Sequence, residues 1–453
     1  MAFINTPTGP VYVADKSDKP IEATREATDL STKTVCLVDT GLALHLAPVL
    51  AKSFGQVLYY LPDSDSYKKT DRSQIGTGIE GVHQITDLWS HVQVDASNRE
   101  IDLFIFPDCS FASEALHLKS LGYRVVSAFR SDLMETDKLL FYETLKAAGL
   151  PVAPFEVITG IEPLREHLKG VKGARYIKLR DQKYRGVTET FCCHDAEAID
   201  PVLDEISSIV GQHDDEIQFI VQEPIESCCE IGMDTFNLNG QYADNGLVGI
   251  EGKDEWYICK VAPSVPAVMK DSMEKVAGFF AMSGYQGLYS TENRITENGE
   301  SYFIDATCRM PSPPGELMPE MYAPGCYAQA MWDIGGGDLP VLVPSAKFGV
   351  ELILTSEWYG KGKWLKVDYP PEIADFVKLK NYCVKDGATW VVPNDNDRYI
   401  GAVVGTGNTL EQAAKNATKY AEQVKAHKLN YECDVLAEAQ CAIEEAGKHG
   451  IIF

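Results

Sequence analysis

Short apolar runs alternate with helical stretches along the first third of the chain. Residues 34–39, 57–61 and 101–106 have the length and composition of buried strands. Thr40-Gly41 follows the first of these runs, and a helical stretch then continues through Leu50. Strands that alternate with helices are typical of βαβ units and a parallel sheet. Residues 1–30 are polar without a clear period, and we expect a loose arm there.

The pattern changes after an amphipathic helix that we predict over residues 136–149, with Gly149 as its stop. Pro151 then marks the entry into a mixed α+β stretch that extends to about residue 245. A last section begins near residue 345. The strands predicted in these two sections are residues 175–180, 217–223, 230–236, 349–354 and 399–404, and the helices are residues 271–282 and a stretch from Thr409 past Tyr420.

A turn-forming Asn298-Gly299 pair lies between two β-rich runs. This dipeptide in such a place indicates a β-hairpin. Pairing of the two strands would bring Glu292 close to Asp305, with Arg309 just beyond. Two carboxylates and a guanidinium suit a divalent cation and a phosphoryl or carboxylate group. The alternative interpretation is that these charges are ordinary solvated surface.

The chain is strongly acidic, with 66 Asp and Glu against 41 Lys and Arg among 453 residues, and its formal charge is -25. This charge disfavours nucleic acid and anionic membrane surfaces as partners. The length allows about two to four domains. No apolar run is long enough for a membrane span, and the first residues lack the pattern of a secretion signal.

The cysteines also indicate a reducing compartment. The 12 cysteines are scattered or adjacent, and none has the CxxC spacing of a zinc site. Reduced thiols of this kind are typical of cytosolic proteins. We therefore expect a cytoplasmic protein.

Several charged groups follow one another in a recognisable order. They are Asp137-Lys138 at a helix start, Lys178 in a strand, Gln222-Glu-Pro-Ile225 with Glu230, the acids Glu292 and Asp305, and Arg309. This order resembles the ATP-grasp superfamily of carboxylate–amine ligases over residues 130–320. The chain is most similar to the branch of phosphoribosylamine–glycine ligases and biotin carboxylases, whose C-terminal domain resembles residues 398–413.

The resemblance implies a chain of mixed α/β and α+β class with three parts. These are a Rossmann-like pre-ATP-grasp domain over residues 1–130, a two-lobed ATP-grasp domain over residues 131–340, and a small C-terminal α/β domain of the rudiment-hybrid type over residues 341–453. One lobe, about residues 155–240, would be mobile and would close over the hinge to exclude water.

The same resemblance implies where the nucleoside of ATP binds. Gln222 and Ile225 match the hinge, whose backbone groups bind adenine, although the family usually has Glu at the position of Gln222. Glu230 matches the acid that accepts hydrogen bonds from the ribose hydroxyls. Its spacing from the hinge is one residue longer than usual, so Glu223 is an alternative for this role.

The phosphates of ATP are expected to meet cationic side chains. Lys138 and Lys178 match the two family lysines that neutralise them, and Lys178 is also a catalytic candidate. The family has a glycine-rich loop after the second lysine, but residues 181–186 hold one glycine. Lys183 and Arg185 are candidates to clamp the phosphates in its place, or they are the solvated tip of a hairpin.

Glu292 and Asp305 match the acids that bind Mg²⁺ (or Mn²⁺) in the family. Thr307 stands where the family usually has Asn as a further ligand, so a second metal ion is in question. Arg309 matches the catalytic arginine that stabilises charge on the transferring phosphoryl group and on the acyl-phosphate.

The implied activity is an ATP-dependent ligation of a small-molecule carboxylate to an amine, with a homodimer as a possible assembly. The Gly-Arg-Glu-His motif of phosphoribosylamine–glycine ligases is missing from residues 38–45, and their Gly-Asp-Pro-Glu sequence is missing from residues 311–316. We therefore expect a different acid and amine. The alternatives are a catalytically degenerate nucleotide-binding module and a phosphoribosylamine–glycine ligase proper.

Overall fold

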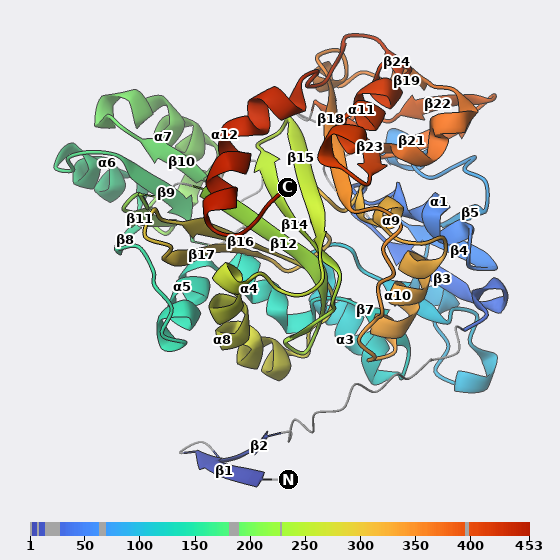
Figure 1. Cartoon of the computed structure of the whole chain (residues 1–453), viewed down its shortest axis with the longest axis horizontal. Coiled ribbons are helices and arrows are strands. Elements are labelled where there is room, and N and C mark those ends of the chain that lie inside the picture. Colours follow the sequence, from blue (N-terminus) through green and yellow to red (C-terminus); the bar gives the residue numbers. More distant parts are fainter. Residues whose placement is uncertain are drawn as a thin grey trace.

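The computed structural model describes residues 2–6, 9–13, 28–62, 69–180, 190–226, 229–394 and 398–453. Over these ranges the chain is a mixed α/β molecule with one parallel sheet and several antiparallel sheets (Figure 1). In the described part, no helix is long and apolar enough to cross a membrane.

The parallel sheet has five strands in the order β5-β4-β3-β6-β7. The strands are β3 (Thr34–Val38), β4 (Gln56–Tyr60), β5 (Val82–Ile85), β6 (Leu103–Ile105) and β7 (Arg124–Val126). One face packs against α3 (Ala112–Ser120), and the other packs against α1 (Leu46–Ala51) and α10 (Cys326–Gly335). The prediction of a parallel sheet with three of these strands is confirmed.

The N-terminal arm is a correction to the prediction. Where we expected no regular structure over residues 1–30, β1 (Ala2–Thr6) and β2 (Gly9–Val13) pair as an antiparallel hairpin. β2 begins with Gly9 and Pro10, which in a sequence usually indicate a loop. The helical stretch predicted after Gly41 also begins later, at Leu46.

A separate lobe contains four antiparallel strands in the order β10-β9-β11-β8. They are β8 (Phe155–Thr159), β9 (Arg175–Leu179), β10 (Thr190–Cys193) and β11 (Gln218–Gln222), covered by α6 (Ile161–Lys169) and α7 (Ala196–Val210). Ile177 and Leu179 of β9 are buried in the lobe's own core. Because side chains alternate along a strand, Lys178 lies on the opposite face of β9.

The largest sheet has ten strands and is antiparallel along the order β17-β16-β12-β14-β15-β18-β23-β20. Its strands are β12 (Cys229–Leu238), β13 (Gln241–Tyr242), β14 (Gly246–Gly252), β15 (Trp256–Ala262), β16 (Gln286–Ile295), β17 (Ser301–Thr307), β18 (Phe348–Ser356), β20 (Val377–Leu379), β23 (Tyr399–Gly407) and β25 (Leu429–Asn430). The pairing of β15 with β18 carries this sheet across the domain boundary predicted near residue 341. The boundary itself stays a prediction.

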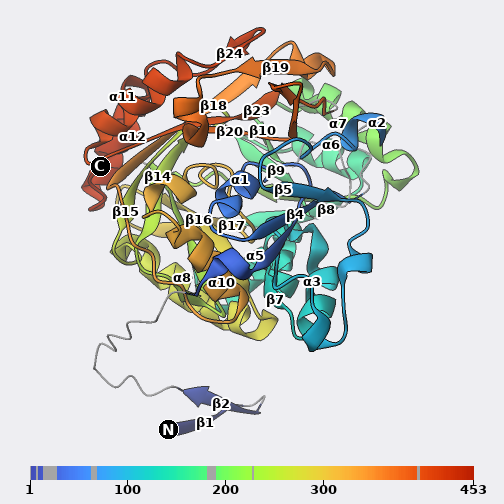
Figure 2. The ribbon, with the colours of Figure 1, turned by 90° about the vertical axis from the view of Figure 1, so that its right-hand side faces the viewer.

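The C-terminal section adds a four-stranded sheet and two helices. The sheet contains β19 (Leu365–Asp368), β21 (Tyr382–Lys385), β22 (Ala388–Val391) and β24 (Lys425–Ala426). The predicted helix α11 (Leu410–Ala421) begins after Thr409, which accepts a hydrogen bond from the Gln412 amide at 3.2 Å. α12 (Val435–Lys448) packs over β12 and β14. Figure 2 shows these C-terminal elements arching over the parallel sheet.

Three helices position the site between the sheets. They are α4 (Leu133–Thr136), α5 (Lys138–Ala147) and α8 (Ala267–Ser283). The Asp137 carboxylate caps α5 by accepting hydrogen bonds from the amides of Leu139 and Leu140, both at 3.0 Å. Such a cap satisfies amides that have no partner within the helix. The cap therefore fixes the backbone position of Lys138, the first residue of α5.

Candidate functional site

The two acids predicted to meet across the hairpin do so. β16 and β17 pair in antiparallel register with Glu292 directly opposite Asp305. Gly299 in the connecting turn has a φ of 83°, a conformation that glycine adopts without steric cost. A bulge follows Glu292, and such a bulge bends the strand locally. The carboxylates therefore share one face of the sheet, as the sequence predicts.

Lys138 binds Asp305 through an ion pair and hydrogen bond between its ammonium and Oδ1. Burial opposes the ionisation of Asp305, but the charges of Lys138, Lys178 and Arg309 lower its pKa. Burial and the charge of Asp305 raise the pKa of Glu292 to about 8. A cation bound at this pair would favour the ionised form of Glu292.

Arg309 is held by a residue that the sequence analysis missed. Its Nε donates to Glu135 Oε1 at 2.8 Å, and the backbone amide of Cys308 donates to Glu135 Oε2 at the same distance. Glu135 is buried on α4, and its charge raises the pKa of Arg309. The guanidinium is therefore fixed in place and remains charged. A lone Glu two residues before a helix cap gives no sequence signal for this role.

Lys178 reaches toward α5 rather than toward the two acids. Its ammonium donates to the Tyr142 hydroxyl at 2.8 Å, and that hydroxyl donates to Gln222 Oε1 at 3.1 Å. The backbone amide of Lys138 also donates to the Arg180 carbonyl at 2.7 Å. Tyr142, another residue without a sequence signal, thus connects the lobe lysine to the hinge strand β11.

The predicted nucleoside residues are spread over separate contacts. Gln222 is buried against Tyr142, and the backbone amide of Glu223 donates to the Pro154 carbonyl at 2.9 Å. Ile225 lines a cavity of about 580 Å³ beside the hairpin turn. These residues follow one another at the end of β11 and make different contacts.

Glu230 is held by an arginine of the neighbouring strand. Arg294 Nε donates to Glu230 Oε2 at 2.8 Å, and the guanidinium carbon lies 5.7 Å from the centre of the Tyr176 ring. Glu223 lies 3.5 Å from an arginine nitrogen of Arg175. Glu223 and Glu230, the two acids predicted to bind ribose, are therefore each paired with an arginine. A ribose hydroxyl would compete with that arginine for the carboxylate.

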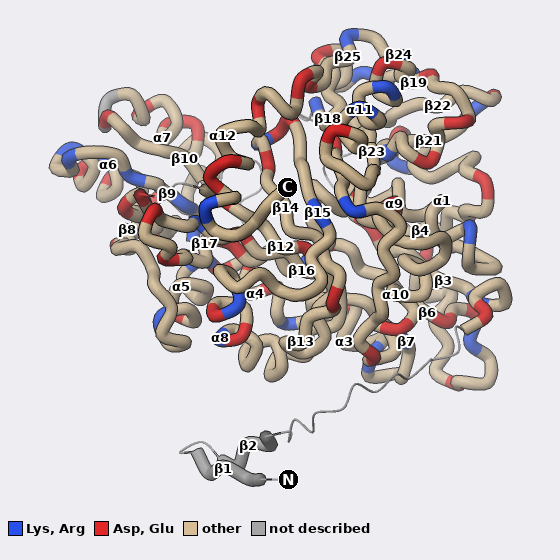
Figure 3. Tube along the Cα trace, in the orientation of Figure 1, with Lys and Arg blue, Asp and Glu red and all other residues tan. Residues whose placement is uncertain are grey.

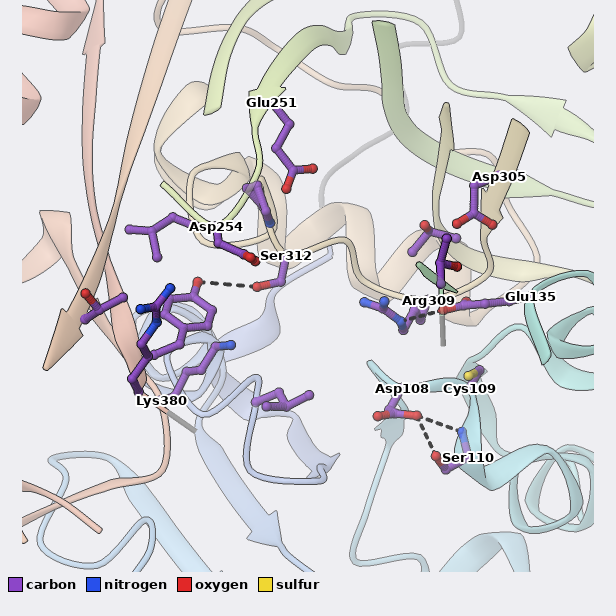
Figure 4. A pocket seen from close by; sticks show the side chains of 18 of the residues that line it. Asp108, Cys109, Ser110, Glu135, Glu251, Asp254, Asp305, Arg309, Ser312 and Lys380 are labelled. Atoms are coloured by element: carbon purple, nitrogen blue, oxygen red, sulfur yellow. Dashed lines mark hydrogen bonds and ion pairs between the residues drawn. The ribbon is translucent and has the colours of Figure 1, made fainter. Parts of the chain in front are cut away.

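A cavity of about 990 Å³ is lined by residues from all three predicted parts of the chain. Asp108, Cys109 and Ser110 come from the loop after β6, where the Thr40 hydroxyl donates to Asp108 Oδ2 at 3.0 Å. The expected site contributes Lys138, Asp305, Thr307 and Arg309, with Glu135. Figure 4 shows Arg309, Glu135 and Asp305 together on one side and Lys380 on the other. Lys183 and Arg185 lie outside the described residues.

Glu292 and Asp305 fit a magnesium ion that is also bound by phosphate. Among the described residues, no group of three His, Cys, Asp or Glu side chains is arranged to hold a metal ion. Magnesium sites at phosphates usually use one or two carboxylates and take the remaining oxygens from phosphate and water. Thr307 pairs with Ser290 at the edge of the same hairpin and lines the cavity.

No protein-family model matches the chain, and no curated protein matches it by sequence. Solved structures do match. A phosphoribosylamine–glycine ligase from Thermotoga maritima has a TM-score of 0.65 at 16% identity, over 88% of this chain and 99% of that one. The chain has the ATP-grasp fold.

Other proteins with the ATP-grasp fold match over similar lengths. An L-amino acid ligase from Bacillus licheniformis has a TM-score of 0.56 at 12% identity, over 89% of this chain and 99% of that one. The biotin carboxylase domain dimer of a Hydrogenobacter thermophilus 2-oxoglutarate carboxylase, solved with MgADP, ADP and bicarbonate, has a TM-score of 0.57 at 13% identity. The match covers 90% of this chain and 98% of the carboxylase chain. The resemblance stated from sequence is thus confirmed for the fold.

Proposed function

We propose that this chain is an ATP-dependent ligase that joins a carboxylate to an amine and releases ADP and phosphate. One observation carries the proposal. Glu292 and Asp305 face each other on the hairpin, Lys138 binds Asp305, and Arg309 stands on the same cavity wall. The match to solved ligases and to a MgADP complex supports it.

The proposed reaction proceeds through an acyl-phosphate. A carboxylate oxygen of the substrate attacks the γ-phosphorus of ATP, the bond to the β-phosphate oxygen breaks, and ADP leaves with the electron pair. The amine nitrogen then attacks the acyl carbon and loses a proton. Phosphate leaves with one oxygen of the original carboxylate. No nucleophilic side chain is needed, so the protein positions and stabilises charge.

Each candidate residue has its own role in the proposed reaction. Lys138 and Lys178 neutralise the phosphates of ATP. The Arg309 guanidinium, fixed by Glu135, stabilises the transferring phosphoryl group and the acyl-phosphate. Glu292 and Asp305 would hold Mg²⁺ (or Mn²⁺), which when bound neutralises charge on the β- and γ-phosphates.

Water has to be kept from the acyl-phosphate, and the lobe of about residues 155–240 is the element we assign to this task. The lobe has its own core, which includes Leu203 and Phe219. It meets α5 through the hydrogen bonds of Lys178 with Tyr142 and of the Arg180 carbonyl with Lys138, and the Phe155 ring packs on Tyr142 with ring centres 5.1 Å apart. An interface of this mixed kind opens more readily than a large apolar one. Closure of the lobe over bound ATP is therefore compatible with its packing.

The proposal is tested by phosphate release from ATP with a panel of small acids and amines, each alone and in pairs. We expect release that requires an acid and an amine together, with a product mass equal to the two minus water. Release with neither, or with the acid alone at the same rate, would contradict ligation. Tight ATP binding without turnover for any pair would favour the degenerate nucleotide-binding module instead.

A further inference from the structure

The two lysines assigned to the phosphates are held in different ways. Lys138 is paired with the carboxylate of Asp305. Lys178, on β9 of the lobe, donates instead to the hydroxyl of Tyr142, which belongs to α5 outside the lobe. The donor and acceptor atoms of this hydrogen bond lie 2.8 Å apart. One lysine is therefore anchored by a charge, and the other is anchored by a neutral hydroxyl.

The Tyr142 ring is fixed by its packing. Tyr142 is 2% exposed. The centre of its ring lies 5.4 Å from that of Phe141, on the same helix, and 5.1 Å from that of Phe155, the first residue of β8. Buried side chains in a close-packed interior have little freedom to change rotamer. The hydroxyl therefore offers the lysine a fixed point of attachment.

The hydroxyl connects Lys178 to the hinge strand without a carboxylate. An ammonium group can only donate hydrogen bonds, so the Tyr142 hydroxyl accepts from Lys178. The hydroxyl donates its own proton to Gln222 Oε1 at 3.1 Å. Gln222 is buried at the end of β11 and carries no charge. These contacts hold the ammonium in place and do not neutralise it.

The anchored ammonium can still bind phosphate. An ammonium group has three N–H donors, and the contact with Tyr142 uses one of them. Burial opposes the ionisation of Asp305, but the charges of Lys138 and then of Lys178 lower its pKa. The ammonium of Lys178 therefore lies within electrostatic reach of this proposed metal ligand. A phosphate group bound beside the metal ion would meet the lysine at a fixed position.

We propose that Tyr142 is a positioning residue that holds Lys178 where it meets the phosphates of ATP. The inference rests on the proposed function, because that function assigns Lys178 to the phosphates. Without the hydroxyl, the flexible four-carbon side chain of the lysine loses its anchor. The carboxylate of Asp305 then attracts the ammonium away from the phosphates, and the ammonium competes there with the proposed metal ion.

The substitution Tyr142→Phe tests this role because it removes the hydroxyl and keeps the packed ring. Calorimetric titration, without acid or amine, measures the binding of MgATP and of adenosine, which has no phosphate. The proteins compared are the wild type, Tyr142→Phe, Lys178→Gln and the double variant. Tyr322→Phe is the matched control. Tyr322 is 3% exposed and donates to the Asn245 carbonyl at 2.9 Å, but it does not line the cavity of about 990 Å³.

We expect Tyr142→Phe to weaken the binding of MgATP by about tenfold and to leave the binding of adenosine unchanged. In the Lys178→Gln background the same substitution should have little further effect, because residues that act through one contact are not additive. Tyr322→Phe should bind both ligands as the wild type does. This pattern requires the hydroxyl to act through the lysine, and the lysine to act on phosphate.

Other patterns overturn the inference. Unchanged or tighter binding of MgATP to Tyr142→Phe would mean that the hydroxyl is not needed to position the lysine, or holds it away from the phosphates. Equal weakening in the wild-type and Lys178→Gln backgrounds, or equal weakening of MgATP and adenosine, would mean that Tyr142 only supports the structure. Ligation in the panel above can fail while MgATP still binds, so the failure of the proposed function is distinguished from the failure of this inference.

Discussion

At the scale of residues, the contacts of the site converge on Asp305. It faces Glu292, binds Lys138 and lies near Arg309. In Asp305→Asn the side chain keeps its shape and loses its charge, so Lys138 loses its counter-ion and the proposed metal ion loses a ligand. We expect turnover to fall by about 100-fold or more while far-ultraviolet circular dichroism stays unchanged.

Asp234→Asn is the control for this substitution. Asp234 is also a buried acid of the large sheet, but its carboxylate accepts from Tyr257 at 2.5 Å and does not line the cavity. Its variant should retain turnover. Full activity of Asp305→Asn, measured as phosphate release, would remove Asp305 from the reaction.

Glu351 predicts how stability changes with pH. Burial and Glu316 keep its pKa well above the ordinary value of 4.5 in the folded protein. Above pH 4.5 the unfolded chain releases this proton and the folded chain retains it, so the free energy of unfolding falls as the pH rises. The Glu351→Gln substitution removes this loss.

Thermal unfolding at several pH values measures the effect. Relative to wild type, Glu351→Gln should gain about 1 kcal/mol or more in unfolding free energy between pH 5 and pH 8, since one pKa unit is worth about 1.4 kcal/mol. Glu372→Gln, at an exposed position, should show no such trend. A constant difference between Glu351→Gln and wild type would mean that Glu351 is ionised in the fold.

At the scale of elements, the tight packing of α11 on β23 depends on glycine. A Cβ at Gly405 would lie 2.3 Å from the Ala417 amide nitrogen and 2.4 Å from the Ala413 carbonyl oxygen. Gly405→Val should therefore push α11 away and destabilise the protein by about 1–3 kcal/mol, measured by chemical denaturation.

Gly278→Ala is the comparison for Gly405. A Cβ at Gly278, within α8, meets no heavy atom within 4 Å. Alanine is the better helix former, so this variant should gain about 0.5–1 kcal/mol. Equal stability of Gly405→Val and wild type would show that α11 is not packed as closely as its backbone contacts indicate.

The elements show what local sequence can and cannot predict. The hairpin of β16 and β17 was predictable because Asn298-Gly299 fixes its turn, and that turn sets the register of Glu292. The pairing of β15 with β18 was not, because it joins segments about 90 residues apart without a local signal. Glu135 and Lys380 line the cavity through such long-range packing, which explains why no local pattern indicates either.

At the scale of the whole molecule, charged residues occur in all three predicted parts of the coloured trace, and Lys and Arg are interspersed with the more numerous Asp and Glu (Figure 3). The acidic surface is consistent with small-molecule substrates rather than nucleic acid. The positive charge at the cavity therefore comes from individual Lys and Arg side chains in different parts of the chain. The cavity is lined by these side chains only because the parts pack together. Arg309 comes from the predicted ATP-grasp domain and Lys380 from the predicted C-terminal domain.

Closure of the lobe is a prediction at this scale. ATP with Mg²⁺ should draw the lobe toward the hairpin, so amide hydrogen exchange should slow in β9 and β11 by about tenfold or more. Mass spectrometry of peptic fragments measures this. Helix α11, which packs on β23 and contributes no residue to the cavity lining, is the internal control and should not change. Uniform protection of both regions would indicate general stabilisation and no lobe closure.

The acyl-phosphate is the central claim, and isotope transfer tests it directly. The measurement uses the acid that supports phosphate release in the panel, labelled with ¹⁸O in its carboxylate, together with ATP and the amine. The account predicts that each phosphate released carries one ¹⁸O atom, because the carboxylate oxygen that attacked the γ-phosphorus leaves with it. Phosphate without the label would contradict the account, because the acid would then not have been activated by phosphorylation.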